Sequence, residues 1–167
     1  QQLYGQVYQR MYRQLKPLYQ RIRNIQLRLL PQDELLPVEV SKYDQKIVLE
    51  ALHNCIAHQD YTRNGRVVVT EWPERLVFEN EGGFFEGQPD DYVPGDKTPR
   101  RYRNPALAQA MVELNMIDTM GYGIHDMHAR QARRFFPMPD YDLGEPQAVE
   151  DTIARLAEAT TVKEVSA

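Results

Sequence analysis

The feature that most constrains the fold is the stretch of residues 82–103, which fits neither a helix nor a strand. It holds the adjacent glycines Gly82 and Gly83, two further glycines and three prolines, and its apolar residues follow no period. Loops of this length in compact domains are usually functional or disordered. We therefore expect a functional loop here, with regular elements on either side of it.

The residues at the start of the chain predict a helix and a short strand. Residues spaced three or four apart draw one apolar seam along the helix: Tyr4, Tyr8, Met11, Leu15, Leu18 and Ile22. We expect this seam to pack on the domain's own sheet, with a second copy of the chain as the alternative partner. Residues 25–29 then alternate between apolar and polar side chains, as a strand does.

A second helix and a hairpin are predicted next. Ser41 and Asp44 resemble a capping box that opens a helix. A turn at residues 64–65 leads into residues 66–70 and 75–79, two runs with the side chains that strands favour. The two runs predict a β-hairpin.

Two more helices are predicted after the loop, at residues 105–115 and 123–136. Residues 148–159 fit a strand or a helix. This order of elements predicts an α/β sandwich of the α+β kind, in which a mostly antiparallel mixed sheet carries helices on one face.

The expected organisation has three parts. Residues 1–40 form a basic helix and a short strand packed on the domain, and residues 41–140 form its core. Residues 141–167 add a strand or helix that can lead into a further domain. Because the chain begins at Gln1 rather than at methionine, we expect it to be a piece of a longer protein.

Charge is distributed unevenly along the chain. Residues 1–30 carry a net charge of +6 and the remainder carries −10. A basic arm can contact nucleic acid phosphates, fold against its own acidic body or form a solvated helix face. Sequence readout of DNA needs more than scattered arginines, so we expect DNA contacts to come from other domains of the full-length protein.

The composition indicates a cytoplasmic protein without a membrane partner. The chain has no run of about 18 apolar residues and no secretory signal pattern. Cys55 is the single cysteine and lies in an apolar helical stretch, so we expect it in the core as a free thiol.

Three polar residues of the second helix are candidates for chemistry. Glu50, Asn54 and His58 are spaced four apart, so their side chains share one helix face. An amide oxygen can help to hold Mg²⁺, while a carboxylate can orient or deprotonate a water molecule for attack on phosphate. The alternative is a polar face that is merely solvated.

Glycine-containing turns stand at two other places. Asn80 is followed by Gly82 and Gly83 at the end of the hairpin, where glycine lets a backbone approach a ligand closely. Gly121 and Gly123 open the last helix, and a helix N-terminus offers free N–H groups to phosphate. Either set alone is a weak signal, whereas their common order is a stronger one.

Together these motifs resemble a known family. The pattern E-A-L-x-N-x-I-A-H-x-D-Y occupies residues 50–61, N-x-G-G residues 80–83, R-N-P-x-L-A residues 103–108 and G-x-G-I residues 121–124. The combination is similar to the GHKL-type ATPase-like domain of RecG-related, Schlafen/AlbA-type bacterial transcriptional regulators. In that family an AlbA-type DNA-binding domain often precedes this domain.

The resemblance implies a site for ATP and Mg²⁺. It implies that Glu50 is the general base, that Asn54 is the magnesium ligand and that Asn80 lies beside adenine. The other residues expected to bind nucleotide are His58, Gly82, Gly83, Arg103, Gly121 and Gly123. Two positions depart from the family pattern: most members have aspartate in place of Asn80 and a further glycine in place of Phe84.

Our hypothesis from the sequence is an ATP-binding regulatory domain, with or without ATP hydrolysis, of a RecG-related DNA helicase or transcriptional regulator. The rival hypothesis is a degenerate GHKL fold that acts as a non-catalytic dimerisation or protein-interaction module, with a homodimer as the expected assembly. The sequence contains no G-x-x-x-x-G-K-[ST] phosphate loop. We therefore do not expect this chain to unwind DNA by itself.

Two further groups have simpler interpretations. Arg100 and Arg101, together with Arg103, either reach a phosphate from the loop or are solvated. His125 and His128 are three apart on a helix, but no third ligand has a matching position, so we expect no zinc site.

Overall fold

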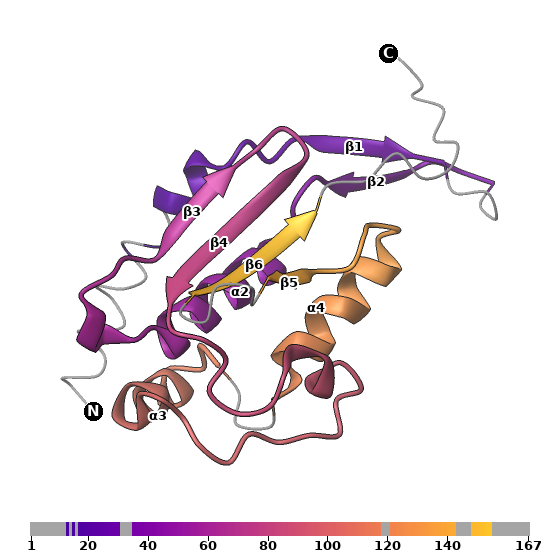
Figure 1. The fold of residues 1–167 in the computed structure, drawn as a ribbon. Coiled ribbons are helices and arrows are strands. Elements are labelled where there is room, and N and C mark those ends of the chain that lie inside the picture. Colours follow the sequence, from indigo (N-terminus) through magenta and orange to yellow (C-terminus); the bar gives the residue numbers. More distant parts are fainter. Residues whose placement is uncertain are drawn as a thin grey trace.

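An antiparallel sheet with helices on one face forms the body of the protein in the computed structural model, which describes residues 13, 15, 17–30, 35–117, 121–142 and 148–154 (Figure 1). Residues 142 and 148–154 are described as backbone only. The strands are β1 Gln26–Leu29, β2 Val38–Ser41, β3 Val68–Glu71, β4 Arg75–Glu81, β5 Asp140–Asp142 and β6 Ala148–Ala154. The helices are α2 Gln45–His58, α3 Pro105–Glu113 and α4 Tyr122–Arg133, with short 3₁₀ turns η1 Tyr61–Arg63 and η2 Pro89–Tyr92.

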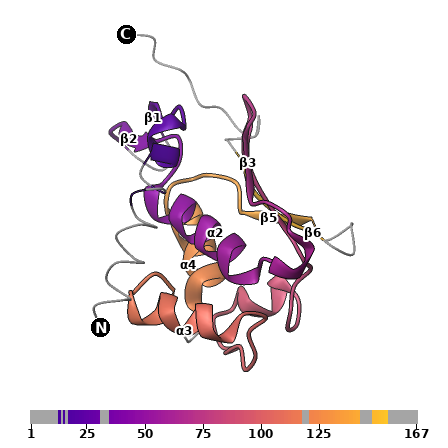
Figure 2. The same ribbon diagram turned by 90° about the vertical axis from the view of Figure 1, so that its left-hand side faces the viewer.

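The main sheet has four strands in the order β3-β4-β6-β5, and all neighbours are antiparallel. Helices α2 and α4 lie on one face of it, which confirms the predicted fold class (Figure 2). The predicted hairpin is β3–β4. Of residues 148–159, which fitted either a strand or a helix, Ala148–Ala154 form β6 and the rest lie outside the described residues. The segment Asp140–Asp142 was not predicted as a strand, because three residues are too few to show a strand pattern.

Helix α2 carries the core of the domain. Asp44 is its N-cap, and the Asp44 carboxylate accepts hydrogen bonds from the backbone N–H groups of Lys46 and Ile47. The predicted capping role of Ser41 was wrong, because Ser41 is the last residue of β2 and pairs with Gln26. The apolar face of α2 packs against β4 in one buried cluster, whose central members are Ile47, Val48, Ala51, Leu52, Cys55, Leu76 and Phe78. Cys55 is fully buried and free, as predicted.

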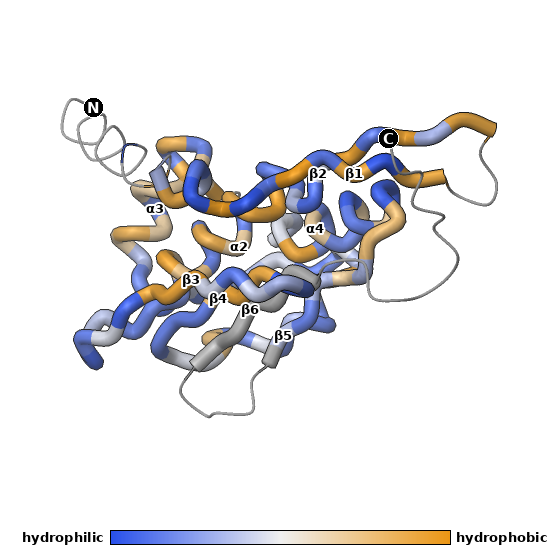
Figure 3. Tube along the Cα trace, turned by 90° about the horizontal axis from the view of Figure 1, so that it is seen from above, coloured by the Kyte–Doolittle hydropathy of each residue, from blue (hydrophilic) through white to orange (hydrophobic). Residues whose placement is uncertain are grey.

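A second, two-stranded sheet stands apart from the main one. Strand β1 pairs with β2, a strand that was not predicted although Val38 and Val40 alternate with Glu39. This hairpin extends away from the body (Figure 3). Asn24 joins it to the body by donating to the carbonyl of Tyr43 and accepting from the Tyr43 N–H group.

The N-terminal seam contacts the domain's own core where it can be followed. Leu15 and Leu18 are partly buried against the main cluster, and Ile22 is buried within it. The first residues of the seam, Tyr4, Tyr8 and Met11, lie outside the described residues. Among the described residues, no helix combines the length and the apolar character that crossing a membrane requires.

Backbone hydrogen bonds join the end of α2 to the end of β4. The Asp60 N–H group donates to the Glu81 carbonyl at 2.7 Å, and the Glu81 N–H group donates to Oε1 of Gln59 at 3.0 Å. Asn104, just before α3, donates through Nδ2 to the carbonyls of Ala57 and Gln59 at 2.9 and 2.8 Å. These contacts form a junction that places the last turn of α2 beside the last residues of β4.

We expect Asn104→Ala to lower the free energy of unfolding by about 1–3 kcal/mol, because two partly buried carbonyls at the end of α2 would lose their donor. Urea unfolding followed by circular dichroism measures this change. Gln109→Ala is the matched control, because Gln109 is exposed and bonds only Glu113 on its own helix. Equal stabilities of the two variants would contradict this role of Asn104.

Candidate functional site

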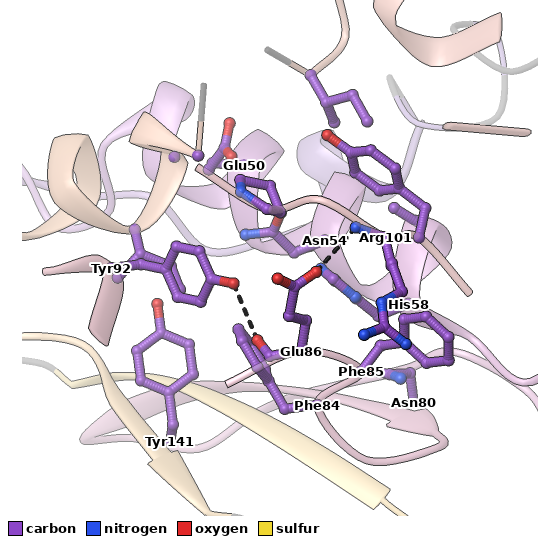
Figure 4. Close-up of a pocket in the computed structure, with 17 residues that line it drawn as sticks. Glu50, Asn54, His58, Asn80, Phe84, Phe85, Glu86, Tyr92, Arg101 and Tyr141 are labelled. Atoms are coloured by element: carbon purple, nitrogen blue, oxygen red, sulfur yellow. Dashed lines mark hydrogen bonds between the residues drawn. The ribbon is translucent and has the colours of Figure 1, made fainter. Parts of the chain in front are cut away.

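One cavity of about 90 Å³ opens between α2, the 82–103 loop and the start of α4. On the same measure, about 10–15 Å³ is enough to admit one water molecule. Figure 4 shows the polar face of α2 on one side of the cavity and loop residues on the other. The residues that line it are Glu50, Asn54, Ala57, His58, Asn80, Phe84, Phe85, Glu86, Tyr92, Pro99, Arg101, Tyr102, Ile117, Gly121, Gly123, Ile124 and Tyr141.

The polar face of α2 runs along this cavity. Glu50, Asn54 and His58 all line it, as their spacing of one helical turn requires. Eight residues separate Glu50 from His58, which corresponds to about 12 Å of helix. In the part of the chain that the structure describes, the side chains of Asn54 and His58 make no hydrogen bond. Two groups that can donate and accept hydrogen bonds therefore face the cavity with no hydrogen bond to a described residue.

The start of α4 closes one end of the cavity. Gly121 is the N-cap and has a φ of 78°, a conformation that favours glycine. Gly123 lies against Glu50, because a Cβ atom at residue 123 would stand only 1.8 Å from Oε1 of Glu50. A carboxylate and the positive end of a helix dipole thus share this end of the cavity.

Asn80 supplies an acceptor from the end of β4. It is almost fully buried, and its Nδ2 group donates to the backbone carbonyls of Glu81 and Gly82 at 3.2 and 3.4 Å. Two carbonyl acceptors fix which end of the amide is the nitrogen. The Asn80 oxygen makes no hydrogen bond to a described residue, so it is left to accept one in the cavity.

An aromatic group lies beside this acceptor. The rings of His58 and Phe84 are stacked with centroids 5.5 Å apart and planes 20° apart, and Phe84 contacts Tyr92 at 5.7 Å. Burial, helped by the nearby positive charge of Arg103, lowers the pKa of His58 from 6.5 to about 4. The imidazole is therefore neutral near pH 7.

Glu86 holds the loop across the mouth of the cavity. Its Oε2 atom accepts from the backbone N–H groups of Arg100 and Arg101 at 3.0 and 2.8 Å, and these bonds lower the Glu86 pKa. Its backbone carbonyl accepts from the hydroxyl of Tyr92 at 2.9 Å. Of the three arginines at residues 100–103, Arg101 lines the cavity.

Six of the predicted site residues line this one cavity: Glu50, Asn54, His58, Asn80, Gly121 and Gly123. The cavity lining does not include Gly82, Gly83 or Arg103. Arg103 donates to the carbonyl of Gly83 at 2.8 Å and lies 3.7 Å from Asp60. Its Nε atom is buried with no hydrogen-bond partner in the described part of the chain. Arg103 thus fastens the Gly82–Gly83 turn to the end of α2.

From the sequence, Phe84 stood out only as a departure from the family pattern, and Tyr92 and Tyr141 were not singled out. These three residues reach the cavity from irregular backbone, from the short turn η2 and from a three-residue strand, so no periodicity marks them. Ring nitrogens of His125 and His128 bond the carbonyls of Val93 and Ile124, and no cluster of metal-binding side chains occurs among the described residues.

Comparison with known proteins agrees with this geometry. The chain belongs to the family described as "Putative ATP-dependent DNA helicase recG C-terminal", whose model matches residues 64–150. The predicted membership of the RecG-related ATPase-like domains is thereby confirmed. No curated relative matches the chain.

A solved structure shares the fold. The DIP2311 protein from Corynebacterium diphtheriae superposes with a TM-score of 0.61 at 23% sequence identity. The match covers 79% of this chain and 26% of that protein, so this chain spans about a quarter of its length.

The depressed pKa of His58 predicts acid sensitivity. Between pH 6.5 and about 4 the unfolded chain binds a proton at this residue that the folded chain does not, so stability falls as pH falls through this window. We expect His58→Gln to lose about 2 kcal/mol less than the wild type between pH 7.5 and pH 5. Urea unfolding at both pH values measures this. His53, whose pKa burial also lowers, contributes equally to both proteins, and parallel losses would contradict the assignment.

Proposed function

We propose that the cavity binds ATP together with Mg²⁺, and that the chain acts as a nucleotide-dependent regulatory domain within a larger DNA-associated protein. The observation that carries this proposal is the face of α2, where Asn54 and His58 line the cavity and their side chains make no hydrogen bond to a described residue. Membership of the RecG C-terminal, ATPase-like family supports the same choice of ligand.

The two ends of the cavity suit the two ends of a nucleotide. Gly121 and Gly123 open α4, and the N-terminus of this helix favours the negative charge of phosphates. At the other end, the Asn80 oxygen accepts a hydrogen bond, which suits the amino group of adenine. The fixed orientation of the Asn80 amide removes the competition from its own NH₂ group.

The residues present also fit Mg²⁺. Asn54 offers an amide oxygen, and Mg²⁺ accepts few protein ligands because it keeps several waters and binds phosphate oxygens. The bound ion neutralises charge on the phosphates. Glu50, one turn away and against the start of α4, would orient a water molecule and take its proton.

A second function is favoured by a different observation. The β1–β2 hairpin and its connection expose Leu35 and Leu36, at 98% and 76% of their surfaces, and Val38 at 38%. Apolar groups gathered in this way often mark contacts with another protein. In this alternative the fold is a dimerisation or protein-interaction module, and Phe84 occupies the position of a family glycine because no nucleotide binds.

A thermal melt distinguishes these functions. We expect ATP with Mg²⁺ at about 100 times its dissociation constant to stabilise the chain by roughly 2.7 kcal/mol, which raises Tm by several degrees. Asn54→Ala should lose this shift, whereas Gln109→Ala, on the exposed face of α3, should retain it. No shift with ATP, ADP or an unhydrolysable analogue would exclude the nucleotide proposal and leave the interaction module.

Hydrolysis depends on a different residue from binding. We expect Glu50→Ala to keep the ATP-induced shift in Tm and to reduce phosphate release by about 10²-fold or more, because the water molecule loses its base. A phosphate-release assay under single-turnover conditions measures this. Glu113→Ala, an exposed change on α3, is the control for a removed carboxylate. If Glu50→Ala hydrolysed ATP at the wild-type rate, Glu50 would not be the base.

A further inference from the structure

We propose that His58 and Phe84 hold the base of the nucleotide: Phe84 supplies a stacking surface, and His58 supplies an in-plane hydrogen bond to the N1 atom of adenine. This inference rests on the proposed binding of ATP and adds the residues that recognise the base. The roles of His58 and Phe84 do not depend on Asn80, which is proposed to contact the amino group of adenine and not N1.

The stacking geometry supports the first half of this role. The rings of His58 and Phe84 are nearly parallel, with 20° between their planes. A base that hydrogen-bonds to the edge of His58 lies close to the plane of that ring, and hence nearly parallel to Phe84. Offset parallel stacking at such centroid distances is favourable for aromatic rings. Tyr92 packs against Phe84 at 5.7 Å and limits its movement.

The hydrogen-bonding state of His58 supports the second half. Its lowered pKa keeps the imidazole neutral near pH 7, so one ring nitrogen carries a donor and the other is an acceptor. Among the described residues none forms a hydrogen bond with either nitrogen. A ligand atom can therefore take the donor without breaking a protein hydrogen bond, and a partly buried donor gains from being satisfied.

Asn80 and His58 together form a pattern of one acceptor and one donor. Both line the cavity, and the junction between α2 and β4 holds their backbones side by side. The matching edge of a base must offer a donor and an acceptor in neighbouring positions. Adenine offers its amino group and N1, whereas guanine offers an oxygen at the place of the amino group. Guanine would thus set its oxygen against the Asn80 oxygen.

The test removes a single atom from the ligand. We expect the wild type to bind 1-deaza-ATP, which lacks the N1 acceptor, about tenfold more weakly than ATP in the presence of Mg²⁺. His58→Phe keeps a flat ring but has no donor, so it should bind both nucleotides with equal affinity. His58→Gln restores an N–H donor and should recover part of the preference. Isothermal titration calorimetry measures all of these affinities.

Gln109→Ala is the matched control, because Gln109 lies on the exposed face of α3 and its removal should leave the tenfold ratio unchanged. Equal binding of ATP and 1-deaza-ATP by the wild type would overturn the role of His58, and so would a tenfold preference that persists in His58→Phe. Should the wild type bind neither nucleotide, the proposed function itself fails. Thermal melts of the His58 variants establish that each is folded, and either variant alone suffices for the comparison.

Discussion

The structure depends on the hydrogen bonds that tie the end of α2 to the end of β4. Because Asp60 bonds the Glu81 carbonyl and Gln59 accepts from the Glu81 N–H group, a helix and a strand end side by side. Asn104 completes the junction from the far side of the loop. Side chains from three separate sequence motifs thereby face one cavity, although no single element carries them. The hydrogen bonds of this junction, made by backbone and side-chain groups, set the relative positions of these side chains.

Arg103 shows how a residue of a sequence motif can support a site although its side chain does not line the cavity. Its guanidinium bonds Gly83, lies near Asp60 and stacks over the ring of Phe85 at 5.2 Å. The same positive charge helps to keep His58 neutral. A residue of this kind shapes both the backbone and the protonation state of its neighbours. The R-N-P pattern is therefore explained by the construction of the junction: Arg103 and Asn104 act on it directly, and proline begins α3.

Local patterns in the sequence predicted much of this molecule. Helical spacing alone placed Glu50 and Asn54 on one face, and the side-chain composition of residues 66–79 predicted the hairpin. The predictions from sequence failed where the structure depends on partners that are distant along the chain. Serine is a residue type that often caps helices, yet the backbone of Ser41 pairs with β1, and Asp44 is the N-cap of α2. The sequence indicated a functional loop at residues 82–103, but it could not show that Glu86 and Tyr92 line the cavity, since irregular backbone has no periodic pattern.

The place of β6 in the main sheet has a consequence for how the chain is made. Ala148–Ala154 is an interior strand that separates β4 from β5, although it is the last of the four to be synthesised. While a ribosome is still translating it, β4 has an open edge, and such an edge can pair with strands of other nascent chains. The helices and the β3–β4 hairpin use nearer contacts and can form sooner. Because synthesis runs from the N-terminus, the four-stranded sheet can be completed only after β6 has been made. The part of the cavity wall that Tyr141 of β5 forms is therefore also completed late.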